Sequence, residues 1–233
     1  MKFFLDSVDL DEIAAAAALG VVDGITTNPG LLSQIAMPVE DLIPEICTRS
    51  RGTVSVPVRG EDAETIVADA QRLALVDERV LAKIPLHIEG LRAMSRLRTL
   101  GVRTHATLCC TANQALLAAK CGAYYVSPFV GRIDEWGGSG ADLVAQITEV
   151  FDNYEFETQV MVASVRNAAH VQDAALLGAD ACTLSWKVLQ DLIGHPQTEA
   201  LLARDREAWT RKWVVQCRPC DSARIRCSRT CTG

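Results

Sequence analysis

The chain alternates between short apolar runs and longer amphipathic segments over most of its length. Eight of the apolar runs are rich in β-branched or aromatic residues and show little polar alternation, as parallel strands covered on both faces do. We therefore predict strands at residues 2–5, 22–26, 53–58, 80–84, 103–108, 124–129, 159–163 and 181–184.

The amphipathic segments between these runs predict helices. Asp9, with Glu12 three residues later, has the pattern of a capping box before the alanine-rich stretch 14–18. Pro38 is placed to open the next helix, in which Pro44 is expected to cause a break or a kink. Further helices are predicted at residues 61–76, 89–100, 113–121, 141–154 and 167–177. Four helices end in a glycine shortly before a strand, which is typical of a left-handed helix cap: Gly20, Gly101, Gly122 and Gly178.

This alternation of eight strands with helices predicts an α/β protein, a small (β/α)8 barrel of the TIM type. An extra C-terminal helix at residues 198–213 follows the eighth unit, and we expect it to pack across the barrel or onto a neighbouring molecule. An open doubly wound sheet is the alternative, although no Gly-x-Gly-x-x-Gly motif follows the first strand. We divide the chain into a barrel domain at residues 1–213 and a tail at residues 214–233.

Composition limits the classes of partner. The 233 residues carry a formal net charge of −6, which argues against binding to nucleic acid or to an anionic membrane surface. The N-terminus has no apolar signal segment, and no uninterrupted stretch of about 20 apolar residues occurs, so we expect a soluble, cytoplasmic protein. Phosphorylated ligands remain compatible with this charge, because two or three placed arginines suffice to bind them.

The cysteines fall into two groups. Five of the nine lie in apolar segments and are expected to be reduced core residues: Cys47, Cys109, Cys110, Cys121 and Cys182. The other four crowd into the tail with the spacing Cys217-x2-Cys220-x6-Cys227-x3-Cys231, which fits no standard zinc pattern. We interpret this arginine-rich tail as a disordered or non-native extension, with a small metal or disulfide knot as the alternative.

One lysine interrupts an otherwise apolar strand, in the run Val80-Leu81-Ala82-Lys83-Ile84-Pro85-Leu86. Lysine is rarely buried unless it is paired, and burial lowers its pKa. An ordinary lysine with a pKa of about 10.4 is neutral in only about one molecule in 2,500 at pH 7. A buried lysine is neutral far more often, and its free amine attacks carbonyl groups to form Schiff bases.

Other polar residues fall where the predicted strands end, which in a barrel is the face that carries the active site. Together with Lys83, one carboxylate, several hydroxyls and two arginines are expected to converge there. Such a set of groups suits a Schiff-base site with a phosphate-binding pair of arginines. The residues are Asp6, Thr26, Thr27, Asn28, Thr107, Ser127, Arg132, Ser164, Arg166 and Ser185.

Structural roles are the alternative for several of these residues. Asp6 could cap the first helix, Asn28-Pro29-Gly30 is strong turn chemistry, and the two arginines could lie on the surface. Lys83 could form a structural ion pair with Asp6 across the barrel. His105 is best explained as a hydrogen-bonded core histidine, and no histidine has metal-ligand spacing, so we predict no metal site.

Six segments that contain these residues identify a family. The chain resembles the transaldolase family over about residues 1–213, in particular its short bacterial branch, which also contains fructose-6-phosphate aldolase. The combination is highly specific, although the Thr-Thr-Asn-Pro piece alone would be weak. The segments are Phe4-Leu5-Asp6, Asp23-Gly24-Ile25-Thr26-Thr27-Asn28-Pro29, Ala82-Lys83-Ile84-Pro85, Ala112-Asn113-Gln114-Ala115-Leu116-Leu117-Ala118-Ala119, Tyr125-Val126-Ser127-Pro128-Phe129-Val130-Gly131-Arg132-Ile133-Asp134, and Ala163-Ser164-Val165-Arg166.

The resemblance implies a class I aldol mechanism without metal or other cofactor. Lys83 would form an iminium with the ketone of a sugar phosphate, and Asp6 would take the proton of the C4 hydroxyl as the C3–C4 bond breaks. The three-carbon dihydroxyacetone enamine would then pass to an acceptor aldehyde. The other implied roles are Thr107 for positioning water in proton transfer, Thr26, Asn28, Ser127, Phe129 and His105 for substrate contact, and Arg132, Ser164 and Arg166 for the phosphate.

The implied activity is that of a transaldolase in the pentose phosphate pathway. Its substrates would be fructose 6-phosphate, sedoheptulose 7-phosphate, erythrose 4-phosphate and glyceraldehyde 3-phosphate. The resemblance also implies a homo-oligomer, a pentamer or a decamer. Two alternatives stay open: an aldolase of the fructose-6-phosphate type that releases free dihydroxyacetone, and a sugar-phosphate-binding pseudoenzyme.

Three positions bear on this choice. Members of the family usually carry Glu or Gln at the end of the third strand, where it orients the catalytic water, whereas this chain has Pro57. His105 stands where many transaldolases have Asn, and three alternatives stay open for it: a role in holding water, altered substrate choice, or weak activity. Phe129 follows the transaldolase pattern, while the aldolase branch has Tyr, whose hydroxyl would help to protonate and release the enamine.

Overall fold

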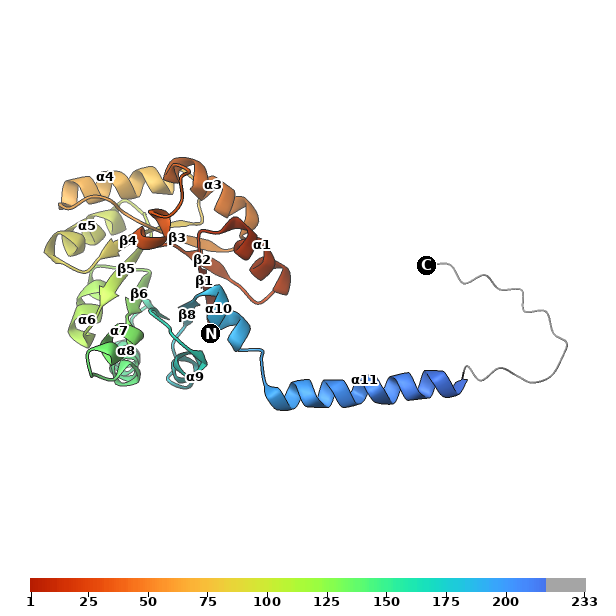
Figure 1. Cartoon of the computed structure of the whole chain (residues 1–233). Coiled ribbons are helices and arrows are strands. Elements are labelled where there is room, and N and C mark those ends of the chain that lie inside the picture. The colour runs from red at the N-terminus through yellow and green to blue at the C-terminus, as the bar shows by residue number, and fades with distance from the viewer. Residues whose placement is uncertain (217–233) are drawn as a thin grey trace, which may run out of the picture. The chain divides into compact units, whose positions relative to one another are not determined.

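Eight parallel strands close into a barrel in the computed structural model of the chain, which describes residues 1–216 (Figure 1). Each strand pairs with the next one in chain order, and β1 closes the barrel by pairing with β8. The predicted (β/α)8 barrel is therefore confirmed, with small differences at the strand ends. The strands are β1 (Lys2–Asp6), β2 (Gly24–Thr26), β3 (Thr53–Pro57), β4 (Val80–Pro85), β5 (Thr104–Cys109), β6 (Tyr125–Pro128), β7 (Gln159–Val162) and β8 (Ala181–Leu184).

Helices alternate with the strands around the barrel. They are α1 (Leu10–Leu19), α2 (Pro29–Leu32), α3 (Val39–Arg49), α4 (Ala63–Ala74), α5 (Ile88–Thr99), α6 (Ala112–Lys120), α7 (Val130–Glu135), α8 (Gly140–Asn153), α9 (Ala168–Leu176) and α10 (Trp186–Asp191). The short helices α2, α7 and α10 follow β2, β6 and β8 and were not expected from the sequence pattern.

The barrel forms one compact unit, residues 1–192, and a second unit begins at Ile193. The described part of this second unit contains α11 (Pro196–Gln216), which continues past the predicted end of the last helix at residue 213. Cys217, Cys220, Cys227 and Cys231, on which the interpretation of the tail rests, lie outside the described residues. None of the helices described in residues 1–216 is long and apolar enough to cross a membrane.

Helix ends follow the local sequence closely. All four predicted glycine caps have a left-handed backbone, with φ of +71° at Gly20 and Gly101, +81° at Gly122 and +79° at Gly178. Of the break or kink expected at Pro44, the break does not occur, because α3 runs through this residue without interruption. A proline inside a helix costs about 3 kcal/mol. Burial of four apolar residues on the inner face of α3 outweighs that cost; they are Leu42, Ile43, Ile46 and Cys47.

Side chains inside the barrel form layers that change character along the strands. The layer nearer the amino-terminal ends is apolar and consists of Phe4, Leu81, Tyr125, Met161 and Ala181. Since side chains on one face of a strand repeat every second residue, the next inward positions lie closer to the carboxyl ends. On β1, β4, β6 and β8 these positions are polar, namely Asp6, Lys83, Ser127 and Thr183. The barrel thus has a closed apolar floor beneath a polar upper part.

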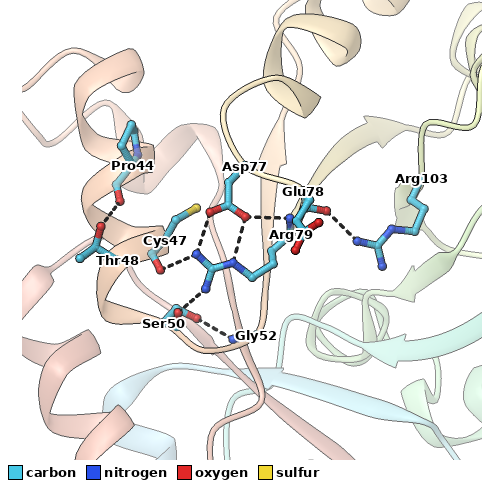
Figure 2. A network of polar contacts seen from close by, with 9 residues as sticks. All are labelled: Pro44, Cys47, Thr48, Ser50, Gly52, Asp77, Glu78, Arg79 and Arg103. Carbon is cyan, nitrogen blue, oxygen red and sulfur yellow. Dashed lines mark hydrogen bonds and ion pairs between the residues drawn. The ribbon is translucent and has the colours of Figure 1, made fainter.

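Arg79, just before β4, bonds this strand to the end of α3 (Figure 2). β4 is the strand that carries Lys83. Arg79 donates hydrogen bonds to the carbonyl oxygens of Ser50 at 2.6 Å and Cys47 at 2.9 Å, which lie at the end of α3. Its guanidinium is also paired with the carboxylate of Asp77, whose pKa falls to about 2 through these hydrogen bonds. The end of α3 and the start of β4 are therefore held together, which fixes where β4 enters the barrel.

Candidate active site

A cavity of about 360 Å³ opens at the carboxyl ends of the strands. It is lined by Asp6, Asn28, Pro29, Pro57, Val58, Lys83, Pro85, Thr107, Leu108, Phe129, Arg132, Ala163, Ser164, Arg166 and Thr183. A larger hollow of about 680 Å³, whose lining includes Arg103 and Tyr124, lies at the opposite end near the starts of β5, β6 and β7. Barrel enzymes place their chemistry at the carboxyl face, so the smaller cavity is the candidate active site.

Lys83 is the buried charge of this cavity. It is only 6% exposed, and its Nζ donates a hydrogen bond of 3.2 Å to the carbonyl oxygen of Thr27. Burial lowers the pKa of Lys83, and the negative charge of Asp6 opposes that shift. The ion pairs of the described residues include none between Lys83 and Asp6, so the suggested structural ion pair is absent. Because desolvation dominates, a larger fraction of Lys83 carries the neutral amine than of an ordinary exposed lysine.

Asp6 is held in place from two neighbouring elements. Thr26 on β2 donates a hydrogen bond to its Oδ1 at 2.9 Å, and the Nδ2 of Asn28 lies 3.1 Å from Oδ2. The hydroxyl of Thr26 also lies 2.6 Å from that of Thr183 on β8. The N-cap of α1 is Asp9, not Asp6, so the capping alternative for Asp6 is wrong. The carboxylate therefore has a fixed orientation at the rim of the cavity.

Asn28 connects this carboxylate to the following helix. Its Oδ1 accepts a hydrogen bond of 3.0 Å from the backbone N–H of Leu31, which makes Asn28 the N-cap of α2. Pro29 at the first helical position supports that start, since its fixed φ suits a helix and its missing N–H is not needed there. The Asn-Pro-Gly segment therefore begins a helix. The Asn28 side chain bonds to the helix start through Oδ1, which leaves its Nδ2 directed at Asp6.

His105 lies behind the cavity and is fully buried. Its Nδ1 lies 2.7 Å from the hydroxyl of Ser55 on β3, and its Nε2 lies 2.7 Å from the hydroxyl of Ser127 on β6. Burial, with the nearby charge of Lys83, holds the pKa of His105 well below its usual range, so the ring is neutral. The interpretation as a hydrogen-bonded core histidine is confirmed. With both ring nitrogens engaged by serines, His105 is not placed to hold a catalytic water.

Thr107 and Pro57, two further positions near Lys83, differ in their hydrogen-bonding groups. Thr107 on β5 is 6% exposed, and its Oγ1 has no protein hydrogen-bond partner among the described residues. Pro57, in register with Lys83 on the neighbouring strand, offers neither a side-chain acceptor nor a backbone N–H. Thr107 therefore brings a buried, unpartnered hydroxyl to the cavity lining, whereas Pro57 brings neither of these hydrogen-bonding groups.

Two arginines also line the cavity. Arg132 lies on α7, and Arg166 follows β7; their side chains are 55% and 49% exposed. Both pair with Glu135, Arg132 at 3.0 Å and Arg166 at 2.9 Å. Ser164 lies between β7 and Arg166 with a left-handed φ of +59°, which is uncommon for a residue other than glycine and is typical of functional sites.

Most of the predicted site residues are brought together at the cavity, whereas Thr26, Thr27, Ser127 and His105 are fully buried behind its lining. Ser185 does not line the cavity either and is the exposed N-cap of α10. The sequence did not reveal two residues that contact the predicted site residues, Thr183 and Glu135. Thr183 lies in a strand that otherwise looks apolar, and only its alternation with Ala181 would have placed it inside the barrel. Glu135 follows the Arg132 segment directly but belongs to no motif. No group of three or more metal-binding side chains comes together in residues 1–216.

Fold and site together define a (β/α)8 barrel with a buried lysine and a pair of arginines at its carboxyl face. The family model described as Transaldolase/Fructose-6-phosphate aldolase matches residues 3–217, and the chain belongs to this family. The chain is similar to proteins named probable transaldolase. That of Desulfotalea psychrophila is 48% identical over 212 residues, or 91% of this chain and 99% of the relative.

A second relative agrees with this assignment, and a solved structure agrees with the barrel fold. The probable transaldolase of Myxococcus xanthus is 46% identical over 212 residues, which cover 91% of this chain and 95% of the relative. A solved structure of a mandelate oxidase mutant with an FMN adduct is similar with a TM-score of 0.53 at 13% identity. The match covers 79% of this chain and 63% of that one, and this likeness concerns the fold alone.

Proposed function

We propose that the protein is a transaldolase that transfers a dihydroxyacetone unit between sugar phosphates through a Schiff base on Lys83. The observation that carries this proposal is the setting of Lys83, a lysine that is 6% exposed, has a lowered pKa and lines the cavity. Membership of the transaldolase/fructose-6-phosphate aldolase family supports the same chemistry. The donors are fructose 6-phosphate and sedoheptulose 7-phosphate, and the acceptors are erythrose 4-phosphate and glyceraldehyde 3-phosphate.

The reaction begins when the neutral Nζ of Lys83 attacks the C2 ketone of the donor and water leaves, which gives an iminium. Asp6 takes the proton of the C4 hydroxyl, the C3–C4 bond breaks, and its electron pair moves into the iminium to form an enamine. The aldehyde product departs, and the enamine attacks the carbonyl carbon of the acceptor aldehyde. Asp6 returns its proton to the new hydroxyl, and water then releases the ketose from Lys83.

The other cavity residues have supporting roles in this proposal. Asn28 contacts a substrate hydroxyl as well as Asp6, Thr107 positions the water of proton transfer, and Arg132, Ser164 and Arg166 bind the phosphate. Ser127 and Thr26 act from behind the cavity, where Ser127 bonds to His105 and Thr26 bonds to Asp6. We further propose that the enzyme works in the cytoplasm as part of the pentose phosphate pathway and assembles into a homo-oligomer, a pentamer or a decamer.

An aldolase that releases free dihydroxyacetone is the second candidate, and Phe129 argues against it. Phe129 lines the cavity, and a phenyl ring has no hydroxyl with which to assist protonation of the enamine. The enamine therefore persists until an acceptor arrives. A coupled assay with and without erythrose 4-phosphate separates the two activities, since a transaldolase needs the acceptor for turnover.

The test of the proposed chemistry is borohydride reduction in the presence of fructose 6-phosphate, followed by peptide mass mapping. We expect a three-carbon adduct on Lys83. The Lys83→Met variant should lose both adduct and activity while keeping the fold. An adduct on another lysine, or an active Lys83→Met variant, would refute the assignment. Calorimetric binding of sugar phosphate without adduct or turnover would instead support a pseudoenzyme, the possibility that Pro57 raises.

A further inference from the structure

The two arginines of the cavity come from separate parts of the chain, and their side chains are held by a single carboxylate. Arg132 belongs to α7, whereas Arg166 lies 34 positions later in the segment that follows β7. Glu135 accepts a hydrogen bond from Nη1 of Arg132 through Oε2 and from Nη2 of Arg166 through Oε1. One carboxylate with two acceptor oxygens thus sets the separation of the two guanidinium groups.

Glu135 contacts the arginines from outside the cavity. Among the residues that the structure describes, the lining includes Arg132 and Arg166 and leaves out Glu135. Each guanidinium has five N–H donors, and Glu135 takes one from each. The remaining donors are available to the oxygens of a phosphate, which therefore does not need to displace Glu135 to bind.

The backbone of the Arg166 segment is tied to the same helix. The N–H of Arg166 donates to Nδ1 of His170 at 3.3 Å, and Nε2 of His170 lies 3.1 Å from Oδ2 of Asp134. Oδ1 of Asp134 in turn accepts a hydrogen bond of 2.7 Å from the N–H of Gly140 at the start of α8. Asp134 therefore links the Arg166 backbone, through His170, to α7 and α8.

Close packing leaves little room for this segment to shift. The N–H of Gly131 donates to the carbonyl oxygen of Ser164 at 3.1 Å, and a Cβ at Gly131 would overlap that oxygen. The left-handed φ of Ser164 shows that its backbone is held in an uncommon conformation by its surroundings. The backbone is fixed in this way, but the long arginine side chains still need a separate restraint.

We propose that Asp134 and Glu135 are positioning residues that pre-assemble the phosphate site, Glu135 by bridging the two guanidinium groups and Asp134 by holding the Arg166 backbone through His170. This inference rests on the proposed function for the nature of the ligand. A negative charge beside a phosphate site also repels the phosphate. Water screens that repulsion, because the Glu135 carboxylate is nearly half exposed. Two arginine side chains that are already ordered lose less rotamer entropy when the phosphate binds, and this gain outweighs the screened repulsion.

The first test is calorimetric titration of inorganic phosphate into the wild-type protein and the Glu135→Ala and Glu135→Gln variants. We expect Glu135→Ala to weaken phosphate binding about fivefold, the size of loss that two half-exposed ion pairs give, and Glu135→Gln to weaken it less. Glu149→Gln, on the exposed side of α8, is the matched control for loss of one negative charge and should not change the affinity. His170→Asn tests the backbone link and should also weaken binding.

The second test separates positioning from a general structural effect through the KM values. In Glu135→Ala, the KM for fructose 6-phosphate should rise by more than the KM for unphosphorylated dihydroxyacetone as donor. Variants that bind phosphate as tightly as or more tightly than the wild type would overturn the proposal, as would a wild type that binds no phosphate. If borohydride trapped no adduct on Lys83, the proposed function would be refuted. The phosphate titration would still test the roles of Asp134 and Glu135 independently.

Discussion

The cavity contains basic groups in two different settings: Lys83, which is 6% exposed, and the pair Arg132 and Arg166, whose side chains are 55% and 49% exposed. Lys83 donates a hydrogen bond to the carbonyl oxygen of Thr27, and burial lowers its pKa. The arginines instead share an acidic partner and stay in contact with water. The difference follows from chemistry: an amine must lose its proton to act as a nucleophile, whereas a phosphate-binding group must keep its charge.

Secondary structure explains how one fold provides both environments. Lys83 lies inside the barrel on β4, just above the apolar layer, where neighbouring strands exclude water. The arginines lie after the strands, on the short helix α7 and on the segment behind β7. Reaction at the lysine therefore depends on burial, and phosphate binding depends on side chains held at the surface.

The largest effect is expected at Asp6, the carboxylate beside the buried amine. Asp6→Asn keeps the shape and a hydrogen-bond acceptor for Thr26 but removes the base, so kcat should fall by a factor of about 10² to 10⁴. Borohydride should still trap sugar on Lys83, now as the uncleaved fructose 6-phosphate adduct rather than the three-carbon unit, because iminium formation precedes bond cleavage. Single-turnover release of aldehyde from fructose 6-phosphate measures the step. A loss of less than about tenfold would exclude Asp6 as the proton acceptor.

A smaller effect is expected at the arginine end. Arg132→Ala and Arg166→Ala should each lower kcat/KM for phosphorylated sugars by about tenfold, the lower part of the range for a charged hydrogen bond, because both side chains are half exposed. The change should appear mainly in KM, and free dihydroxyacetone is the control substrate. Equal losses with both substrates would show that the arginines do not bind the phosphate.

Features with strong local causes could be predicted from the sequence. The eight strands follow from apolar runs, and the left-handed ends at Gly20 and Gly178 follow from glycine before a strand. Lys83 could be identified because it is flanked on both sides by apolar residues of a buried strand, which places it in the interior. The family resemblance then indicated that the residues around the mouth form one site.

Features that depend on tertiary packing could not be predicted. The sequence predicts a break or a kink at Pro44, but α3 continues through this residue, because the pattern along the helix does not reveal how well its inner face packs. Glu135 looks like any exposed acidic residue until the fold brings Arg166 beside it. The sequence also left open whether His105 holds water, and only the positions of Ser55 and Ser127 on two other strands determine its partners.

A pH-dependent difference in stability is expected for the buried amine. The folded-state pKa of Lys83 is lowered from 10.5, so the unfolded chain binds more protons between the folded and unfolded pKa values, and stability rises with pH in that window. Lys83→Met should therefore be more stable than the wild type at neutral pH, and the gap should shrink as the pH rises toward 10.5. Urea unfolding at several pH values measures it, with Lys187→Met, at a side chain 84% exposed, as the control. A gap that does not change with pH would contradict the lowered pKa.

The smallest effect concerns a single hydroxyl beside the lysine. Because the buried Oγ1 of Thr107 has no partner in residues 1–216, Thr107→Val should raise the free energy of unfolding by about 1 kcal/mol. Thr183→Val is the matched control: its hydroxyl lies 2.6 Å from that of Thr26, and its loss should lower the free energy of unfolding by about the same amount. Turnover of Thr107→Val should nevertheless fall, because the proposed role of this hydroxyl is to position water for proton transfer. If Thr107→Val were destabilised like Thr183→Val and kept full turnover, Thr107 would be a structural residue, and the buried end of the cavity would contain one functional group fewer than proposed.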